Sequence, residues 1–186
     1  MVQEETIEFE GYACIFNTCD QVCDLVHPGA FSAALSARGA GGVRMLFNHD
    51  VSEPIGIWNE LREDIRGLYC RGTLLAGVQR AQEVATLLSA GGLDGLSIGF
   101  TAKRAQADPT TGIRHLREVD LWEISLVTFP MQDMARITRI NALPVDSKGS
   151  VPQRTVHSQQ GTQTKADLAY KMTAAASYIR NQGHSV

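Results

Sequence analysis

The chain has 186 residues, of which 44% are hydrophobic and 20% are charged, and its formal net charge is −3. This balance is ordinary for a globular protein with one domain-sized core and a short appendage. A basic excess is missing, which argues against a nucleic-acid-binding surface, and no apolar run approaches the ~20 residues that a membrane span needs. The acidic, alternating N-terminus MVQEETIEFE is unlike a secretory signal, so we expect a cytoplasmic protein.

Strand-like segments dominate the first 75 residues. Residues 6–16 alternate apolar and acidic side chains at their start, which is typical of a half-buried strand. Residues 54–61 and 67–75 predict two more strands, divided by the polar turn REDIR. Residues 42–50 predict a strand whose one face carries Val43, Met45, Phe47 and His49.

One helix is expected in the body of the chain, over residues 77–92, and Gly91 and Gly92 provide its end. Its apolar stripe consists of Val78, Ala81, Ala85 and Leu88. Strand character returns in residues 96–104 and 113–130, on either side of the turn DPTTG. An order of strands, one helix and strands favours a β-rich barrel or an α+β domain over repeated βαβ units.

Composition changes near Leu143. Residues 143–164 are rich in Ser, Thr, Gln, Gly and Pro and cannot bury enough apolar surface to offset their ordering entropy. We therefore expect a domain over residues 1–142, a flexible linker over 143–164 and a tail helix over 165–186. The helix is predicted by apolar residues at helical spacing, namely Leu168, Met172, Ala175 and Ile179.

The four cysteines, Cys14, Cys19, Cys23 and Cys70, include no C-x-x-C pair, and no histidine cluster completes a zinc site. We expect free thiols in a reducing compartment, with no metal and no other cofactor.

Ser97 is the centre of a Gly-x-Ser-x-Gly pattern in the segment GLSIGF. In an α/β-hydrolase a helix follows such a serine at once. Here the helix precedes it, and Leu96, Ile98 and Phe100 alternate through it, so Ser97 is expected within a strand and facing away from those side chains. A generic esterase of that fold is disfavoured. Ser97 is either a structural residue or a nucleophile carried on a strand.

A serine nucleophile needs a base, which is usually a histidine. His157 and His184 fall in the linker and the tail, His27 lies in a Pro-Gly turn, and His115 lies between arginines on a strand. His49 ends an apolar strand where the chain opens into a loop. It is the best candidate base among the five histidines, but from the residues alone a structural histidine is the favoured interpretation.

The acidic candidates for orienting that base are Asp50, Glu118, Asp120 and Glu123. Asp50 adjoins His49, but neighbours on a strand point to opposite faces. Glu123 is surrounded by apolar residues, where a charge is costly unless it is paired or solvated in a cleft. The alternative is that Glu123 faces solvent together with its strand neighbour Ser125.

Three segments, in this order and spacing, resemble the prohead serine proteases of tailed phages. They are FNHD around His49, GLSIGF around Ser97, and LWEISLVTFPMQDMARI near the end of the body. The segments EGYACIFN, HPGAFSAAL and PIGIWNELREDIRGLYCRGTL are also similar to that family, so the resemblance covers roughly residues 10–141.

The resemblance implies that Ser97 is the nucleophile, His49 the general base and Glu123 the third member, with His115 as its rival. The family is similar in fold to the herpesvirus assembly proteases, which implies a β-rich α+β domain built as a small, mostly antiparallel barrel with flanking helices. Backbone N–H groups must receive the oxyanion; the loop KRAQADPTTGIR, with Arg104, is a weak candidate for this role.

The resemblance also implies a substrate and a place of action. The major capsid protein or its scaffolding segment would be cut inside the assembling prohead, in the host cytoplasm. Charge and hydropathy, and not the resemblance, are the reasons to expect no nucleic-acid and no membrane partner. Self-cleavage in the linker, attachment through the tail helix and a homodimer are further expectations. The alternative function is a non-catalytic capsid-assembly or scaffolding factor that keeps the protease fold, for which Ser97→Ala would leave assembly unchanged.

Overall fold

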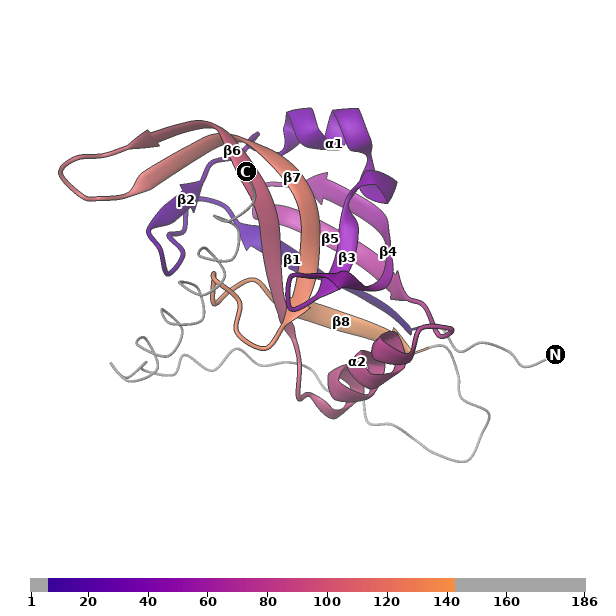
Figure 1. Ribbon diagram of the computed structural model, residues 1–186. Helices are drawn as coiled ribbons and strands as arrows, with labels where there is room; N and C mark the ends of the chain where they lie inside the picture. Colours follow the sequence, from indigo (N-terminus) through magenta and orange to yellow (C-terminus); the bar gives the residue numbers. More distant parts are fainter. Residues whose placement is uncertain (1–6, 143–186) are drawn as a thin grey trace. The chain divides into compact units, whose positions relative to one another are not determined.

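The computed structural model describes residues 7–142; the predicted linker 143–164 and tail helix 165–186 lie outside that range. Eight strands and few helices make up the described chain (Figure 1). The strands are β1 (Ile7–Ile15), β2 (Asp24–Val26), β3 (Arg44–Phe47), β4 (Asp50–Glu63), β5 (Gly67–Leu74), β6 (Gly95–Ala107), β7 (Arg114–Val127) and β8 (Ile137–Ala142). The helices are α1 (Ser32–Arg38), the short 3-10 helix η1 (Ala40–Gly42) and α2 (Gln79–Ala90).

All eight strands form one mixed sheet. Its order is β2-β7-β3-β4-β5-β1-β8, with β6 on the other side of β7. The strands β2 and β3 both pair with β7 in parallel, at its two ends, while the remaining pairings are antiparallel. The expectation of a β-rich α+β domain with flanking helices is confirmed.

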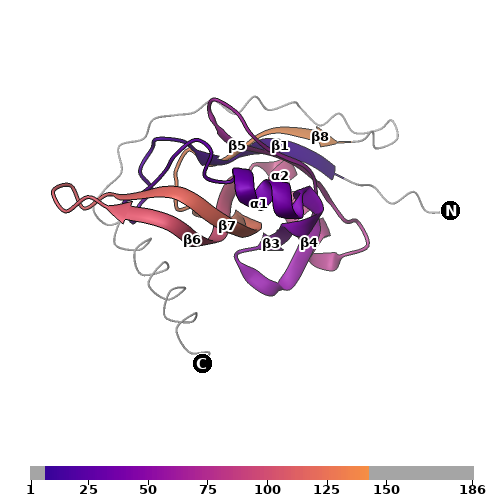
Figure 2. The same ribbon diagram turned by 90° about the horizontal axis from the view of Figure 1, so that it is seen from above.

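The expected small barrel is wrong because the sheet does not close, although most of its strand pairings are antiparallel, as expected. Strands β6 and β8 each pair with one neighbouring strand, and in the described chain they meet only where Gly95 bridges to Arg136, the residue before β8. Two backbone hydrogen bonds of 3.0 and 2.8 Å, Leu96 N–H to the Ala135 carbonyl and Ile137 N–H to the Asp94 carbonyl, reinforce this corner. The rest of β6 pairs with β7, and the two strands form a long hairpin, which Figures 1 and 2 both show. A ladder that joins edges at one corner cannot close a barrel.

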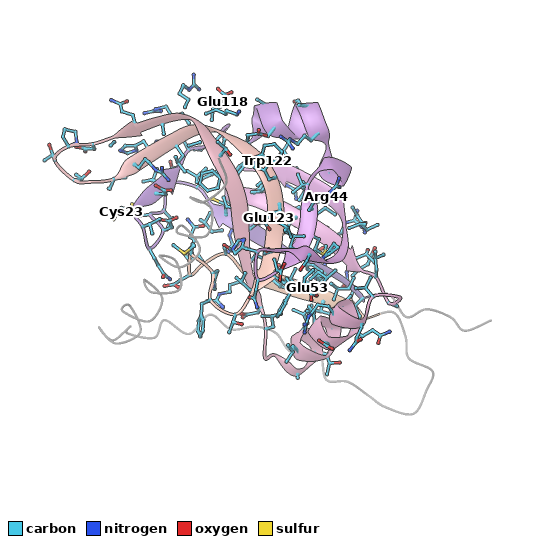
Figure 3. All side chains as sticks on the ribbon, viewed as in Figure 1. Cys23, Arg44, Glu53, Glu118, Trp122 and Glu123 are labelled. Atoms are coloured by element: carbon cyan, nitrogen blue, oxygen red, sulfur yellow. The ribbon has the colours of Figure 1, made fainter. Side chains whose placement is uncertain are left out.

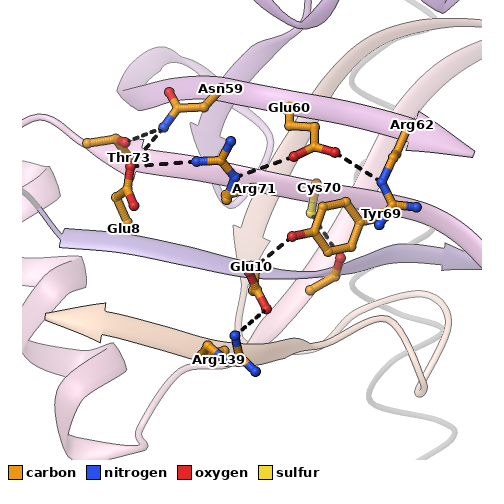
Figure 4. A network of polar contacts seen from close by, with 11 residues as sticks. Glu8, Glu10, Asn59, Glu60, Arg62, Tyr69, Cys70, Arg71, Thr73 and Arg139 are labelled. Atoms are coloured by element: carbon orange, nitrogen blue, oxygen red, sulfur yellow. Dashed lines mark hydrogen bonds and ion pairs between the residues drawn. The ribbon is translucent and has the colours of Figure 1, made fainter.

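Apolar and polar side chains alternate along β1, β4 and β5, so this part of the sheet has one apolar face and one polar face. On the core side, Phe9, Leu68 and Cys70 have no exposed surface. On the opposite side, ion pairs and hydrogen bonds link the strands (Figure 4), including Glu10 to Tyr69 at 3.0 Å and Arg71 to Glu60 at 3.4 Å. These groups are mostly half-exposed, so each pair contributes little to stability, about 1 kcal/mol or less.

The predicted helix is α2, and its end has the expected cause. Gly91 adopts a left-handed conformation (φ 72°), its N–H bonds the Leu88 carbonyl, and the Gly92 N–H bonds the Leu87 carbonyl. This is a Schellman ending, for which glycine is favoured. The buried stripe consists of Ala81, Val84 and Leu88, whereas the predicted Val78 precedes the helix and Ala85 is only partly buried.

Helix α1 and strands β2 and β8 were not predicted; all three are short. Within residues 7–142, no helix combines the length and the apolar character that a bilayer crossing requires.

Candidate active site

Strands β6 and β7 carry the polar residues at the centre of the candidate site. Their antiparallel register sets Ser97 opposite Ser125, and Gly99 opposite Glu123. Residues two apart on a strand share a face, so these four residues lie on one side of the hairpin. The expectation that Ser97 lies within a strand is confirmed, and Leu96, on the other face, is completely buried in the core.

His49 reaches this face from a turn and not from a strand, so the predicted strand face through His49 is wrong. β3 ends at Phe47, which pairs with Asp50, and the two residues between them, Asn48 and His49, have φ of 50° and 61°. A two-residue hairpin turn of the I′ type requires positive φ at both positions. Asn tolerates that conformation better than most side chains, which explains the position of Asn48 before the histidine.

Ser97, His49 and Glu123 form a continuous hydrogen-bonded line. His49 Nε2 lies 3.0 Å from Ser97 Oγ, and His49 Nδ1 lies 2.6 Å from Glu123 Oε1. Ser97 is 4% exposed and Glu123 8%. The place of Glu123 among the side chains of the sheet can be followed in Figure 3. The alternative of a solvent-facing Glu123 is therefore wrong, because the carboxylate is buried and paired with the histidine.

Two further residues shape this site and were not assigned a role from the sequence. Ser125, which is completely buried, donates a hydrogen bond to Glu123 Oε2 (2.7 Å) and accepts one from the backbone N–H of His49 (3.0 Å). A Cβ at Gly99 would lie 2.1 Å from Glu123 Oε1. The role of Ser125 could have been predicted from the sequence, because a serine two residues from a carboxylate stands out in an otherwise apolar strand. The role of Gly99 depends on the pairing register of β6 and β7, which the sequence pattern does not reveal.

The remaining candidate residues lie elsewhere or are used by other partners. His115 contacts His27, with 3.0 Å between Nδ1 and Nε2. It lies eight residues from Glu123 along β7, or about 27 Å for a regular strand. Asp50 binds the N–H and the hydroxyl of Ser52 at 2.9 and 2.6 Å. The structure therefore does not bring His115 or Asp50 to His49.

The loop that was the weak oxyanion candidate is also remote. Arg104 lies seven residues beyond Ser97 on β6, which is about 23 Å for a regular strand. The loop is the tip of the β6–β7 hairpin, beyond the rest of the sheet (Figure 1). It cannot contact an oxyanion formed at Ser97, and this expectation is wrong. Among the described residues, no group of three or more His, Cys, Asp or Glu side chains is arranged to hold a metal ion.

Comparison with solved structures gives a fold related to viral proteases. The protease of Kaposi's sarcoma-associated herpesvirus (KSHV), solved with a hexapeptide phosphonate inhibitor, matches with a TM-score of 0.52 and 13% identity, over 93% of this chain and 77% of that one. The bacteriophage T4 capsid assembly protease, gp21, matches with a TM-score of 0.47 and 16% identity, over 66% and 82% of the two chains. The first of these likenesses shows a shared fold.

Sequence comparison is more specific. The chain is 37% identical to the prohead protease of Enterobacteria phage HK97 over 137 residues, which are 73% of this chain and 60% of that protein. It thus spans less than two thirds of the length of this relative. The family model described as caudovirus prohead serine protease matches residues 1–147, the part of the chain that carries Ser97, His49 and Glu123. The chain belongs to the caudovirus prohead serine protease family.

Proposed function

We propose that the protein is a serine endopeptidase that cleaves capsid or scaffold protein during maturation of the phage prohead. The observation that carries the proposal is the line from Ser97 Oγ through both ring nitrogens of His49 to Glu123, with distances of 3.0 and 2.6 Å. A hydroxyl, an imidazole and a carboxylate in this order are the arrangement that activates a serine nucleophile. Family membership supplies the class of substrate.

The proposed mechanism gives each of the three residues one role. Ser97 Oγ attacks the carbonyl carbon of the peptide bond while His49 Nε2 takes its proton. His49 then gives that proton to the leaving amine as the C–N bond breaks, and water hydrolyses the acyl-enzyme by the same steps. Glu123 accepts a hydrogen bond from the Nδ1–H group, which keeps the imidazole in the productive tautomer and stabilises its charged form. Loss of an orienting carboxylate lowers kcat by about 10⁴-fold in a related arrangement.

The substrate and the location follow the family. The HK97 relative is a prohead protease, and we propose that the present protein acts inside the assembling prohead on the major capsid protein or its scaffolding segment. Cleavage of its own chain within residues 143–164, attachment through residues 165–186 and dimer formation extend this proposal. A non-catalytic assembly factor is the alternative; nothing in that function requires a base between a buried serine and a buried carboxylate.

Two measurements on the full chain test the proposal. A fluorophosphonate probe, which phosphonylates activated serines, should label wild-type protein at Ser97, as found by peptide mapping, and should not label Ser97→Ala. Ser89→Ala is the matched control, because Ser89 is an exposed serine on α2 whose hydroxyl donates to the Ala85 carbonyl (2.8 Å).

The second measurement is intact mass over time, with and without capsid protein from the same phage. Ser97-dependent loss of mass from the capsid protein supports the endopeptidase, and Ser97-dependent loss of residues beyond 142 supports self-cleavage. Wild-type protein that is neither labelled nor able to cut capsid protein would support the assembly factor and overturn the proposal.

A further inference from the structure

A closed ring of hydrogen bonds begins and ends on His49. The backbone N–H of His49 donates to Ser125 Oγ over 3.0 Å, and Ser125 Oγ donates to Glu123 Oε2 over 2.7 Å. The other oxygen of Glu123 lies 2.6 Å from Nδ1 of the His49 ring. Backbone and ring of one histidine are therefore tied to each other through two side chains of β7.

The chemistry of the donors fixes the direction of this ring. A backbone N–H can only donate, so Ser125 Oγ accepts from His49 and has its single proton available for Glu123. An ionised carboxylate can only accept, so the bond between Glu123 Oε1 and Nδ1 uses a hydrogen on Nδ1. In the neutral imidazole the lone pair is then on Nε2, which faces Ser97 Oγ at 3.0 Å. This is the tautomer that a general base at Ser97 needs.

We propose that Ser125 is a positioning residue, whose hydroxyl holds the His49 turn and the Glu123 carboxylate in the one arrangement that directs Nε2 at Ser97. This inference rests on the proposed protease function. Ser125 suits the role because it has no exposed surface and lies in β7 between β3 and β6. The strands on both sides hold its backbone in place through their pairing with β7.

The turn itself needs such an anchor. Asn48 and His49 both have positive φ, a conformation that non-glycine residues adopt only when their surroundings fix it. The structure ties both residues to β7, through the Asn48 N–H to the Leu126 carbonyl (3.0 Å) and the His49 N–H to Ser125 Oγ. The second bond is also connected to Glu123 through the same hydroxyl, so Ser125 couples the direction of the ring to the position of the carboxylate.

The test compares phosphonylation rates of Ser97 in folded full-length variants. Ser125→Ala should be labelled roughly 10- to 100-fold more slowly, as for loss of a supporting hydrogen-bond partner. Ser125→Thr keeps the hydroxyl and should recover most of the rate. Ser125→Cys fills the space with a weak donor and acceptor and should remain slow, which keeps the test open if Ser125→Ala does not fold. Val119→Ala, a buried change on the same strand away from the ring, should label at nearly the wild-type rate.

Two further readouts separate positioning from simple packing. If Ser125 acts through Glu123, the change Ser125→Ala should lower the phosphonylation rate of Ser97 only slightly further when Glu123 has already been replaced by Gln. In addition, the Nδ1 proton of His49 should give a slowly exchanging NMR signal far downfield in wild-type protein and lose that protection in Ser125→Ala. Wild-type labelling rates in folded Ser125→Ala, additive losses in the double variant, or an unchanged Nδ1 signal would each overturn the inference. Absence of labelling in wild-type protein would instead count against the protease function, and the NMR comparison would still decide on Ser125.

Discussion

Gly99 and Glu123 lie directly opposite each other on β6 and β7, and the missing side chain at Gly99 leaves the space that the Glu123 carboxylate occupies. The second glycine of the Gly-x-Ser-x-Gly pattern therefore serves the acid of the site, which is not its role in a nucleophile elbow. The register links it to the serine: Ser97 and Gly99 are two residues apart on β6, as are Ser125 and Glu123 on β7.

Replacement of Gly99 by alanine should move the carboxylate. The added Cβ would lie 2.1 Å from Oε1 and 2.8 Å from Cδ of Glu123, and a side-chain end moves more easily than a strand. We expect a folded protein whose Ser97 is phosphonylated on the order of 10- to 100-fold more slowly. Gly41→Ala is the matched control, because nothing lies within 4 Å of its added Cβ. Equal labelling rates for the two variants would contradict this role of Gly99.

The turn at Asn48 should accept glycine and resist branched residues. Asn48 is exposed and has φ of 50°, so Asn48→Gly should keep both stability and labelling of Ser97. Asn48→Val should lower the free energy of unfolding by about 1–2 kcal/mol, the cost of left-handed backbone for a residue with a branched Cβ. It should also slow labelling, because His49 is the next residue in the turn. Urea unfolding with parallel labelling checks this, and a stable, fully active Asn48→Val would show that the turn does not constrain His49.

The contribution of Asp20 to the free energy of unfolding should fall as the pH rises from about 4 to about 6. Burial, and secondarily the charge of Asp24, raise its pKa from the ordinary value of 3.8 to about 6, against backbone hydrogen bonds that lower it. The folded protein thus binds this proton more tightly than the unfolded chain, so the stabilisation is complete at low pH and is lost through that window. Asp20→Asn is neutral throughout and keeps an oxygen to accept the same bonds, so its unfolding free energy should fall less over this range.

A carboxylate with the opposite shift is the control for Asp20. Hydrogen bonds from Thr110 and Thr111 lower the pKa of Asp108, so its contribution is present above pH ~4 and is lost only as the pH falls further. Urea unfolding at several pH values should distinguish Asp108→Asn from wild type by its lost contribution at neutral pH, and Asp20→Asn by its flatter slope between pH 4 and 6. Parallel curves for wild type and Asp20→Asn would contradict the prediction.

The thiols should divide into two reactive and two protected groups. Cys19 and Cys23 are exposed, whereas Cys14 is 3% exposed and Cys70 not at all. Burial raises the pKa of Cys14 to about 12 and that of Cys70 far above its usual range, so neither forms the reactive thiolate at pH 8. Titration with an aromatic disulfide reagent at pH 8 should modify two thiols quickly in native protein and all four in denaturant. Rapid modification of a third thiol in native protein would show that the core opens.

The sequence predicted what depends on local pattern. Alternation of Leu96, Ile98 and Phe100 sufficed to put Ser97 on a strand, and the double glycine sufficed to end α2. It did not predict what depends on long-range pairing. The parallel contact between Met45 and Ile124 joins segments far apart in the chain, and no local periodicity contains that information.

The wrong prediction that His49 lies on a strand has a different origin. Its apolar neighbours continue a strand pattern through Phe47, and the pattern alone does not say where pairing stops. The backbone reverses at Asn48 and His49, which brings Phe47 opposite Asp50. An asparagine followed by one residue and an aspartate was the weak turn signal. The barrel expectation failed because strand count and alternation do not reveal whether two edges meet along their length or only at Gly95 and Arg136.

The insertion of β7 between β6 and β3 also sets when a newly made chain can first act. A ribosome-bound chain that ends before Arg114 contains His49 and Ser97 but lacks Glu123 and the strand against which both are held. The proposed activity therefore has to wait until nearly all of the described chain has been synthesised and β7 has paired on both edges. Order of synthesis alone would keep the proposed protease inactive toward neighbouring polypeptides until β7 has been made.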